Sequence, residues 1–168
     1  EPDKASGIAD KRIPGALEDS GAAYVFVRNG SPWTQQGYLK ASNADANDFF
    51  SYSVALSFDG NTLAVGAHAE NSLAIGINGD QADNSGAGIG AVYAFTRNGA
   101  AWSQAAYVKP TNSLTSGWFG LSVALSGDGR DLVVGAPMDR SAATGVGSNS
   151  SDGSARAAGA AYWYPILN

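Results

Sequence analysis

Five aspartates in turn-like or polar sequence are the residues best suited to chemistry in this chain. Asp59 and Asp128 each precede a glycine, whereas Asp80, Asp83 and Asp152 lie in two long polar segments. Calcium prefers several oxygen ligands, ideally two or more carboxylates. Asp83 and Asp152 occupy equivalent places in a sequence repeat that is described below. We take Asp80, Asp83 and Asp152 as candidates for a weak calcium site, with turn-stabilising hydrogen bonds as the alternative.

Enzyme chemistry has little support among the remaining residues. The one histidine, His68, has no partner in the sequence pattern, and the chain lacks a G-x-S-x-G elbow, a phosphate-binding loop and zinc-spaced histidines. The net charge is −5 with only ten scattered basic residues, which argues against nucleic-acid binding. Cysteine is absent, and the apolar runs are too short to span a bilayer. We therefore predict no catalytic residues, no nucleic-acid partner and no membrane span.

The elements that position these aspartates recur at a fixed period without a gap. Residues 21–67 and 90–136 are identical at 24 of 47 aligned positions. GAAYVF at 21–26 returns as GAVYAF at 90–95 and as GAAYWY at 159–164. A fixed period of this length indicates stacked or radially arranged units, each too small to bury its own apolar face.

Each unit contains four strand-like runs joined by short turns. In the first copy these runs are residues 24–28, 33–40, 50–57 and 63–67, with Asn-Gly and Asp-Gly turns between them. Four short antiparallel strands per unit are typical of a β-propeller blade, so we predict an all-β fold of about 2.4 repeats. A long polar insert follows the fourth run in each copy, at residues 68–89 and 137–158. These inserts are either binding loops or solvated loops in which sequence changes are tolerated.

The order of these motifs resembles the FG-GAP repeat in its bacterial form, which is related to the β-propeller of integrin α subunits. The resemblance rests on WFGLSVALS at 118–126, DG at 128–129, LVVGAP at 132–137 and GAAY at 159–162. The first copy departs from this pattern, because Ser51 replaces the glycine and His68 replaces the proline. The resemblance implies that the Phe-Gly run is the innermost strand of each blade and that the Trp-containing run is the outermost.

Calcium is the usual cofactor that the resemblance implies, bound in a D-x-D-x-D-G-x-x-D loop. Aligned on Asp59, this motif has only one carboxylate left, and the same holds for Asp128. The other ligand positions are occupied by Ala55, Ser57 and Leu63 in one copy and by Ala124, Ser126 and Leu132 in the other. We predict that the family's calcium site is lost and that Asp59 and Asp128 form turns.

The blade order that the resemblance implies divides the chain into residues 1–48 (half a blade), 49–110 (a full blade) and 111–168 (a partial blade). Nine strands cannot close a ring of at least four blades. We therefore expect self-association, or the rest of a longer chain, to complete the propeller. The first residue is Glu1 and not Met, which favours a processed or excised piece.

Binding or adhesion, without catalysis, is the function that the resemblance implies. It places the protein outside a bacterial cell or on its surface, with the periplasm as the alternative. A non-catalytic accessory propeller of a larger secreted enzyme is a second hypothesis. A lectin-like propeller is a third, in which Trp33, Trp102, Tyr38 and Tyr107 stack on sugars, although blade-to-blade packing explains their recurrence better. The residues do not identify a protein or glycan ligand.

Overall fold

A computed structural model describes residues 17–28, 30–112 and 117–167 of the chain. Those residues form nine β-strands and no helix, so the predicted all-β fold is confirmed. The strands are β1 (Ala23–Arg28), β2 (Trp33–Leu39), β3 (Ser53–Leu56), β4 (Thr62–Ala67), β5 (Ala91–Asn98), β6 (Ala101–Val108), β7 (Ser122–Leu125), β8 (Asp131–Ala136) and β9 (Ala160–Pro165). Every pair of neighbouring strands within a sheet is antiparallel.

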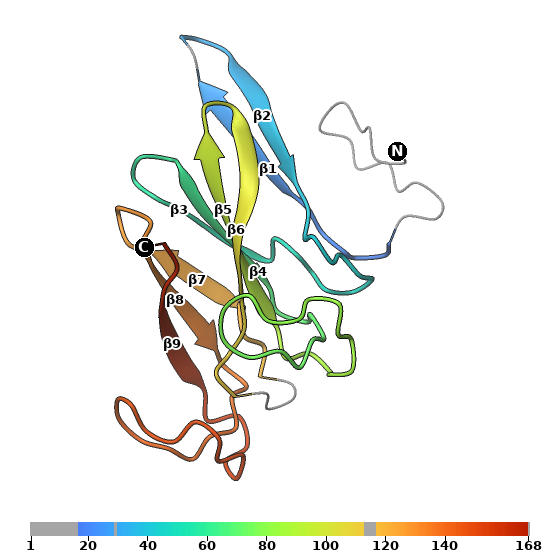
Figure 1. Ribbon diagram of the computed structural model, residues 1–168, viewed down its shortest axis with the longest axis vertical. Helices are drawn as coiled ribbons and strands as arrows, with labels where there is room; N and C mark the ends of the chain where they lie inside the picture. The colour runs from blue at the N-terminus through green and yellow to red at the C-terminus, as the bar shows by residue number, and fades with distance from the viewer. Residues whose placement is uncertain (1–16, 29, 113–116, 168) are drawn as a thin grey trace.

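The strands form three sheets, which we call the first (β1–β2), central (β3-β4-β5-β6) and last (β7-β8-β9) sheets (Figure 1). In the central sheet the spatial order equals the chain order, as expected for four strands joined by hairpins and one long insert. Strand β3 contacts β7 of the last sheet, and the Trp-containing β6 forms the opposite edge. The implied order, from the run that follows Phe-Gly at one edge to the Trp run at the other, is therefore present in the central sheet.

The core lies between the sheets and follows from the two faces of each strand. Large side chains on one face of the central sheet, among them Val65, Tyr93 and Phe95, pack toward Ala23 and Leu39 of the first sheet. Small side chains on its other face pack against the last sheet, where the cluster includes Ala64, Ala94, Phe119, Leu132 and Val134. Alternation along a strand places these sets on opposite faces, so each sheet presents a bulky face to one neighbour and a small face to the other.

The third run begins later than predicted, at Ser53 and not at residue 50. Phe49 (φ 55°) and Ser51 (φ 74°) adopt the left-handed region, which breaks the extended strand. Ser51 stands where the second copy has Gly120 (φ 88°), a residue that reaches this conformation without strain. The buried Phe50 lies in this turn, and its N–H donates to the carbonyl of Ser20 at 3.2 Å.

Candidate functional site

The two inserts, residues 68–89 and 137–158, project from their sheets as compact loops (Figure 1). In the first insert Gly86 N–H donates to the carbonyl of Asn71 at 2.7 Å, and Gly90 N–H donates to that of Glu70 at 2.9 Å. The second insert repeats both bonds at the equivalent positions, from Ala155 to Arg140 at 3.0 Å and from Gly159 to Asp139 at 3.1 Å. Two loops of different sequence therefore close in the same way.

The first insert also covers the edge of the central sheet. Asn78 N–H donates to the carbonyl of Tyr107 at 2.7 Å, and its side-chain oxygen accepts from Tyr107 N–H at 3.0 Å. Lys109 N–H donates to the carbonyl of Gly76 at 2.8 Å. Residues 76–78 thus use backbone groups that an uncovered edge strand would leave unpaired.

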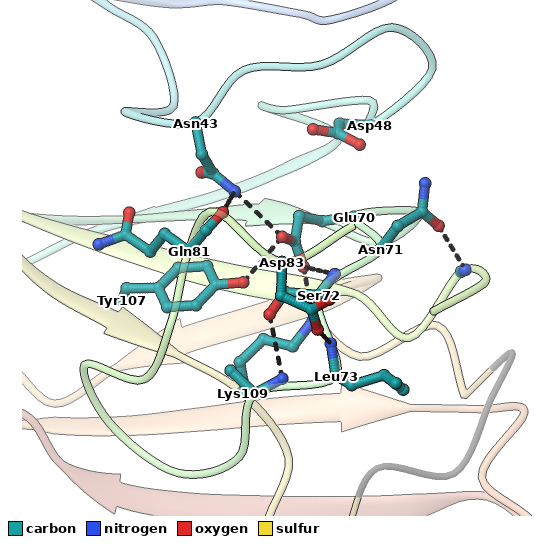
Figure 2. A network of polar contacts seen from close by, with 12 residues as sticks. Asn43, Asp48, Glu70, Asn71, Ser72, Leu73, Gln81, Asp83, Tyr107 and Lys109 are labelled. Atoms are coloured by element: carbon teal, nitrogen blue, oxygen red, sulfur yellow. Dashed lines mark hydrogen bonds and ion pairs between the residues drawn. The ribbon is translucent and has the colours of Figure 1, made fainter. Parts of the chain in front are cut away.

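A buried carboxylate holds the base of the first insert (Figure 2). Glu70 Oε2 lies 2.5 Å from Lys109 Nζ and accepts from Ser72 N–H at 3.2 Å. Its Oε1 accepts from the Tyr107 hydroxyl at 2.8 Å and from Asn43 Nδ2 at 3.1 Å. Glu70 and Lys109 are both fully buried, so each charge is compensated by the other and by hydrogen bonds. We call Asn43, Glu70, Ser72, Tyr107 and Lys109 the anchor cluster.

Burial controls the proton affinities around the anchor cluster. It lowers the pKa of Lys109, an effect that the Glu70 carboxylate opposes. Burial and the negative charge of Glu70 raise the pKa of the Tyr107 hydroxyl, which therefore stays protonated and donates. Burial, with a smaller contribution from Glu70, raises the pKa of the nearby Asp48 to about 6, although the N–H of Asp45 donates to it and opposes the rise. Such shifts also accompany purely structural ion pairs, so they do not identify a catalytic group.

The last sheet contains a second, smaller version of the anchor cluster. Asp139 stands where Glu70 stands, is 2 % exposed, and accepts from the Tyr162 hydroxyl at 2.7 Å and from Asn112 Nδ2 at 3.3 Å. Its other oxygen accepts from Ser141 N–H at 2.8 Å. Because acid, amide and serine recur at one spacing, the amide and serine contacts are the same at both inserts, whereas the donating tyrosine is Tyr107 of β6 in one and Tyr162 of β9 in the other.

The inserts have the same internal hydrogen bonds but different exposed side chains. Ser72 Oγ donates to the carbonyl of Asp80 at 2.8 Å, as Ser141 Oγ does to that of Asn149 at 3.0 Å. The first insert exposes three apolar side chains, Leu73, Ile75 and Ile77, which we call the apolar ridge. The corresponding residues of the second insert are Ala142, Thr144 and Val146.

The predicted calcium candidates are separated by the structure into two inserts. Asp80 Oδ1 accepts from Ala82 N–H at 2.9 Å, and Asp152 Oδ1 accepts from Ser154 N–H at 3.0 Å. Asp83 accepts from the N–H groups of Ser85 at 3.0 Å and Leu73 at 2.6 Å, and the bonds from Ser85 and Leu73 lower its pKa. No group of three or more His, Asp or Glu side chains able to hold a metal ion occurs in the described ranges. A calcium site at these residues stays a prediction.

Asp59 and Asp128 make the contacts of turn residues. The Ser57 hydroxyl donates to Asp59 at 2.6 Å, and the Ser126 hydroxyl donates to Asp128 at the same distance. Each carboxylate also accepts a backbone N–H two residues on, from Asn61 at 3.0 Å and from Arg130 at 3.2 Å. These bonds lower the pKa of both aspartates, whose oxygens are thus engaged within their own turns.

The aromatic side chains considered for sugar stacking differ in their environment. Tyr107 is buried in the anchor cluster, and Trp102 lies against β2, where its Nε1 donates to Gln36 Oε1 at 3.3 Å. Trp33 and Tyr38 are exposed on the first sheet. A separate ring cluster surrounds His68, with centroids of Phe49, Tyr52 and Trp118 at 5.4, 4.4 and 5.9 Å.

Sequence reasoning missed the anchor cluster, although a signal for it was present. Asn43 and Lys109 are far from Glu70 in the sequence, so spacing alone does not connect them. The usable signal is the repeat itself, since Asn43 returns as Asn112, Ser72 as Ser141, and Glu70 as the equally acidic Asp139. Polar residues that recur at the period of the sequence repeat are candidates for buried contacts.

Comparison with known proteins agrees with the predicted resemblance. The model of the FG-GAP repeat family matches residues 33–95 and 102–164, which is three quarters of the chain. No curated protein matches the chain. FG-GAP repeats form propeller-like binding modules that are typical of extracellular or surface domains. No helix long and apolar enough to span a membrane occurs in the part of the chain that the structure describes. The chain belongs to the FG-GAP repeat family.

Proposed function

We propose that this protein is a non-enzymatic binding or adhesion module that acts outside the cell or on its surface. Its ligand contacts the face formed by the two inserts. The observation that carries this proposal is the equivalent anchoring of the inserts by Glu70 and Asp139, each of which accepts from the amide and the serine N–H of the same repeat positions and so holds a long loop in a fixed position. A long loop that is ordered before binding loses less conformational entropy when a ligand docks on it.

The apolar ridge is the preferred contact within this face. Leu73, Ile75 and Ile77 are exposed on a polar loop, and neighbouring exposed apolar side chains often mark interaction sites. Hydrogen bonds of Ser72 and Asp83 hold the backbone beneath this ridge. The second insert, with smaller side chains at these positions, serves as an internal reference for the contribution of the ridge.

An adhesion assay tests this proposal directly. The purified protein is coated on a surface, and attachment of cells and binding of extracellular-matrix proteins are measured. The triple variant L73S/I75S/I77S should lose at least tenfold in binding, and its Tm is measured in parallel because Leu73 and Ile77 are only 38 % and 40 % exposed. Val146→Ser, which changes the fully exposed counterpart of Ile77 on the second insert, is the control. Retention of full binding by the folded triple variant would refute the role of the ridge.

The ring cluster around His68 favours glycan binding as a second candidate function. Tyr52 and Trp118 expose part of their rings, and aromatic faces stack on the apolar faces of sugars. A glycan array with the wild type and Trp118→Ala tests this, with Trp163→Ala as the control on another exposed tryptophan. Glycan binding that Trp118→Ala abolishes would support a lectin-like role. An array on which the wild type binds no glycan would refute that role.

A further inference from the structure

Asp48 is a buried carboxyl group that lies beside the anchor cluster without being part of it (Figure 2). It belongs to residues 40–52, the loop that joins β2 to β3, which we call the connector. Its Oδ2 accepts from the N–H of Asp45 at 3.1 Å. Its Oδ1 is also buried and has no hydrogen-bond partner in the described residues. An ionised carboxylate at this position therefore lacks part of the compensation that burial demands.

The charges that face Asp48 disfavour its ionised form. The carboxylates of Glu70 and Asp45 repel a negative charge there, and the attraction of Lys109 is the weaker effect. Lys109 is already paired with Glu70. Tyr93 also faces Asp48, and burial together with the charges of Glu70 and Asp48 raises the pKa of its hydroxyl, which stays neutral. An ionised Asp48 thus adds a further negative charge to a region in which Lys109 compensates Glu70.

Side-chain hydrogen bonds hold the connector against the first insert. Asn43 Nδ2 donates to the carbonyl of Gln81 at 2.9 Å, in addition to its bond to Glu70. Two further contacts join the connector to the tip of the insert, Ser42 with Gln81 and Asp45 with Asn84. Within the same tip, Asp83 accepts from the N–H of Leu73 at 2.6 Å. The connector, the tip of the insert and the start of the apolar ridge are therefore linked by one chain of contacts.

We propose that Asp48 is a pH-sensitive latch between the connector and the first insert. With a proton, Asp48 stays buried and the connector stays docked on the insert. Without the proton, Asp48 moves toward water and the connector opens more often, because the buried Oδ1 has no donor and Glu70 repels the charge. Opening also frees the tip of the insert, which carries the acceptor for Leu73. The effect on ligand binding rests on the proposed function of the apolar ridge, whereas the latch itself does not.

The pH range of the latch follows from the two states of Asp48. Burial raises its pKa from 3.8 to about 6 in the docked state, and contact with water returns the pKa to its ordinary value in the open state. Protonation therefore favours the docked state fully below about pH 4, and this advantage is lost as pH rises through 6. From pH 5 to pH 8 the opening equilibrium should increase about tenfold, because only the docked state still gains a negative charge in this range.

The second copy of the repeat provides an internal reference for the latch. Gly117 stands where the first copy has Asp48, so this copy has no carboxyl group at the position. The other contacts recur, because Asn112 Nδ2 donates to the carbonyl of Ser150 and to Asp139. The two inserts are thus joined to their connectors in the same way, and the latch is expected in the first copy alone.

Hydrogen exchange measured by mass spectrometry tests the latch without a ligand. The whole chain is labelled at pH 5 and at pH 8, and the rates are corrected for the intrinsic pH dependence of amide exchange. We expect the opening of residues 41–48 and 80–84 to rise about tenfold between these pH values, and that of residues 137–158 to change little. Asp48→Asn keeps the shape of the side chain without its charge and should remove the rise. Asp48→Gly, which introduces the residue type of the second copy, covers the case in which Asp48→Asn fails to fold.

His68 needs a control of its own, because histidine titrates in the same pH range. Its ring stacks on Phe49 of the connector, with centroids 5.4 Å apart. His68→Gln is the matched variant, and it should keep the tenfold rise if Asp48 is the titrating group. Equal opening of the wild type at pH 5 and pH 8 would overturn the inference. A rise that persists in folded Asp48→Asn or Asp48→Gly, or that disappears in His68→Gln, would overturn it as well.

Discussion

Replacing Lys109 with methionine removes the cation from the anchor cluster and leaves the rest of the cluster in place. Methionine retains much of the aliphatic stem, so the main change is an uncompensated Glu70 carboxylate that is fully buried. Breaking a buried pair by removing one partner costs about 3–5 kcal/mol. In a domain of this size that lowers Tm by roughly 10 °C.

The double variant Lys109→Met/Glu70→Gln separates charge from packing. Glutamine keeps the shape of Glu70 and can still accept from Tyr107, so the double variant should recover at least about 2 kcal/mol of the loss. Urea denaturation followed by tryptophan fluorescence gives each free energy of unfolding, with Arg130→Met as an exposed control that changes it by less than about 0.5 kcal/mol. A cost below about 1 kcal/mol for Lys109→Met, or no recovery in the double variant, would refute the role assigned to the pair.

Three further outcomes follow from individual residues. Burial raises the pKa of Asp48 from 3.8 to about 6, so stability from its protonation is present below about pH 4 and is lost as pH rises through 6. Asp48→Asn should therefore stabilise the protein by about 1–2 kcal/mol at pH 7.5 and much less at pH 4, as measured by urea denaturation. Gly66→Ala places a Cβ 2.0 Å from the backbone oxygen of Gly120 and should cost about 2–3 kcal/mol, whereas at Gly127 the nearest atom is 3.9 Å away and alanine should be tolerated. Millimolar calcium should give little stabilisation through the Asp-Gly turns; a rise in Tm of about 5 °C that Asp59→Ala abolishes would contradict this, and one that Asp83→Ala abolishes would establish the insert site.

The repeat made the fold predictable, because strand pairing in each unit depends on local hairpins. The Asn-Gly and Asp-Gly turns and the alternating apolar residues were sufficient to predict four strands per unit, whereas the order of the strands in the blade came from the resemblance to the FG-GAP repeat. The start of β3 was less predictable. Its boundary depends on the left-handed conformation of Phe49 and Ser51, which the sequence signals through Gly120 of the second copy and not through the first.

The candidate site was harder to predict because its contacts join distant parts of the chain. Glu70 was not singled out, since a lone glutamate at the start of a polar loop resembles many exposed glutamates. Its burial depends on β6 bringing Tyr107 and Lys109 to the same end of the sheet. The turn aspartates were predicted correctly to form turns. Asp59 and Asp128 there accept hydrogen bonds from their own neighbours.

The closure of each insert at its base also affects which substitutions the sequence can accept during evolution. The bonds from Gly86 to Asn71 and from Gly90 to Glu70 depend on the ends of the loop and not on the side chains at its tip. Substitutions at the more exposed Ile75 thus change the free energy of unfolding by no more than about 0.5 kcal/mol, whereas Leu73 and Ile77 also lose buried contacts. Each unit can acquire a new recognition surface while its sheet keeps folding, and a gene that duplicates such units can diversify them one loop at a time.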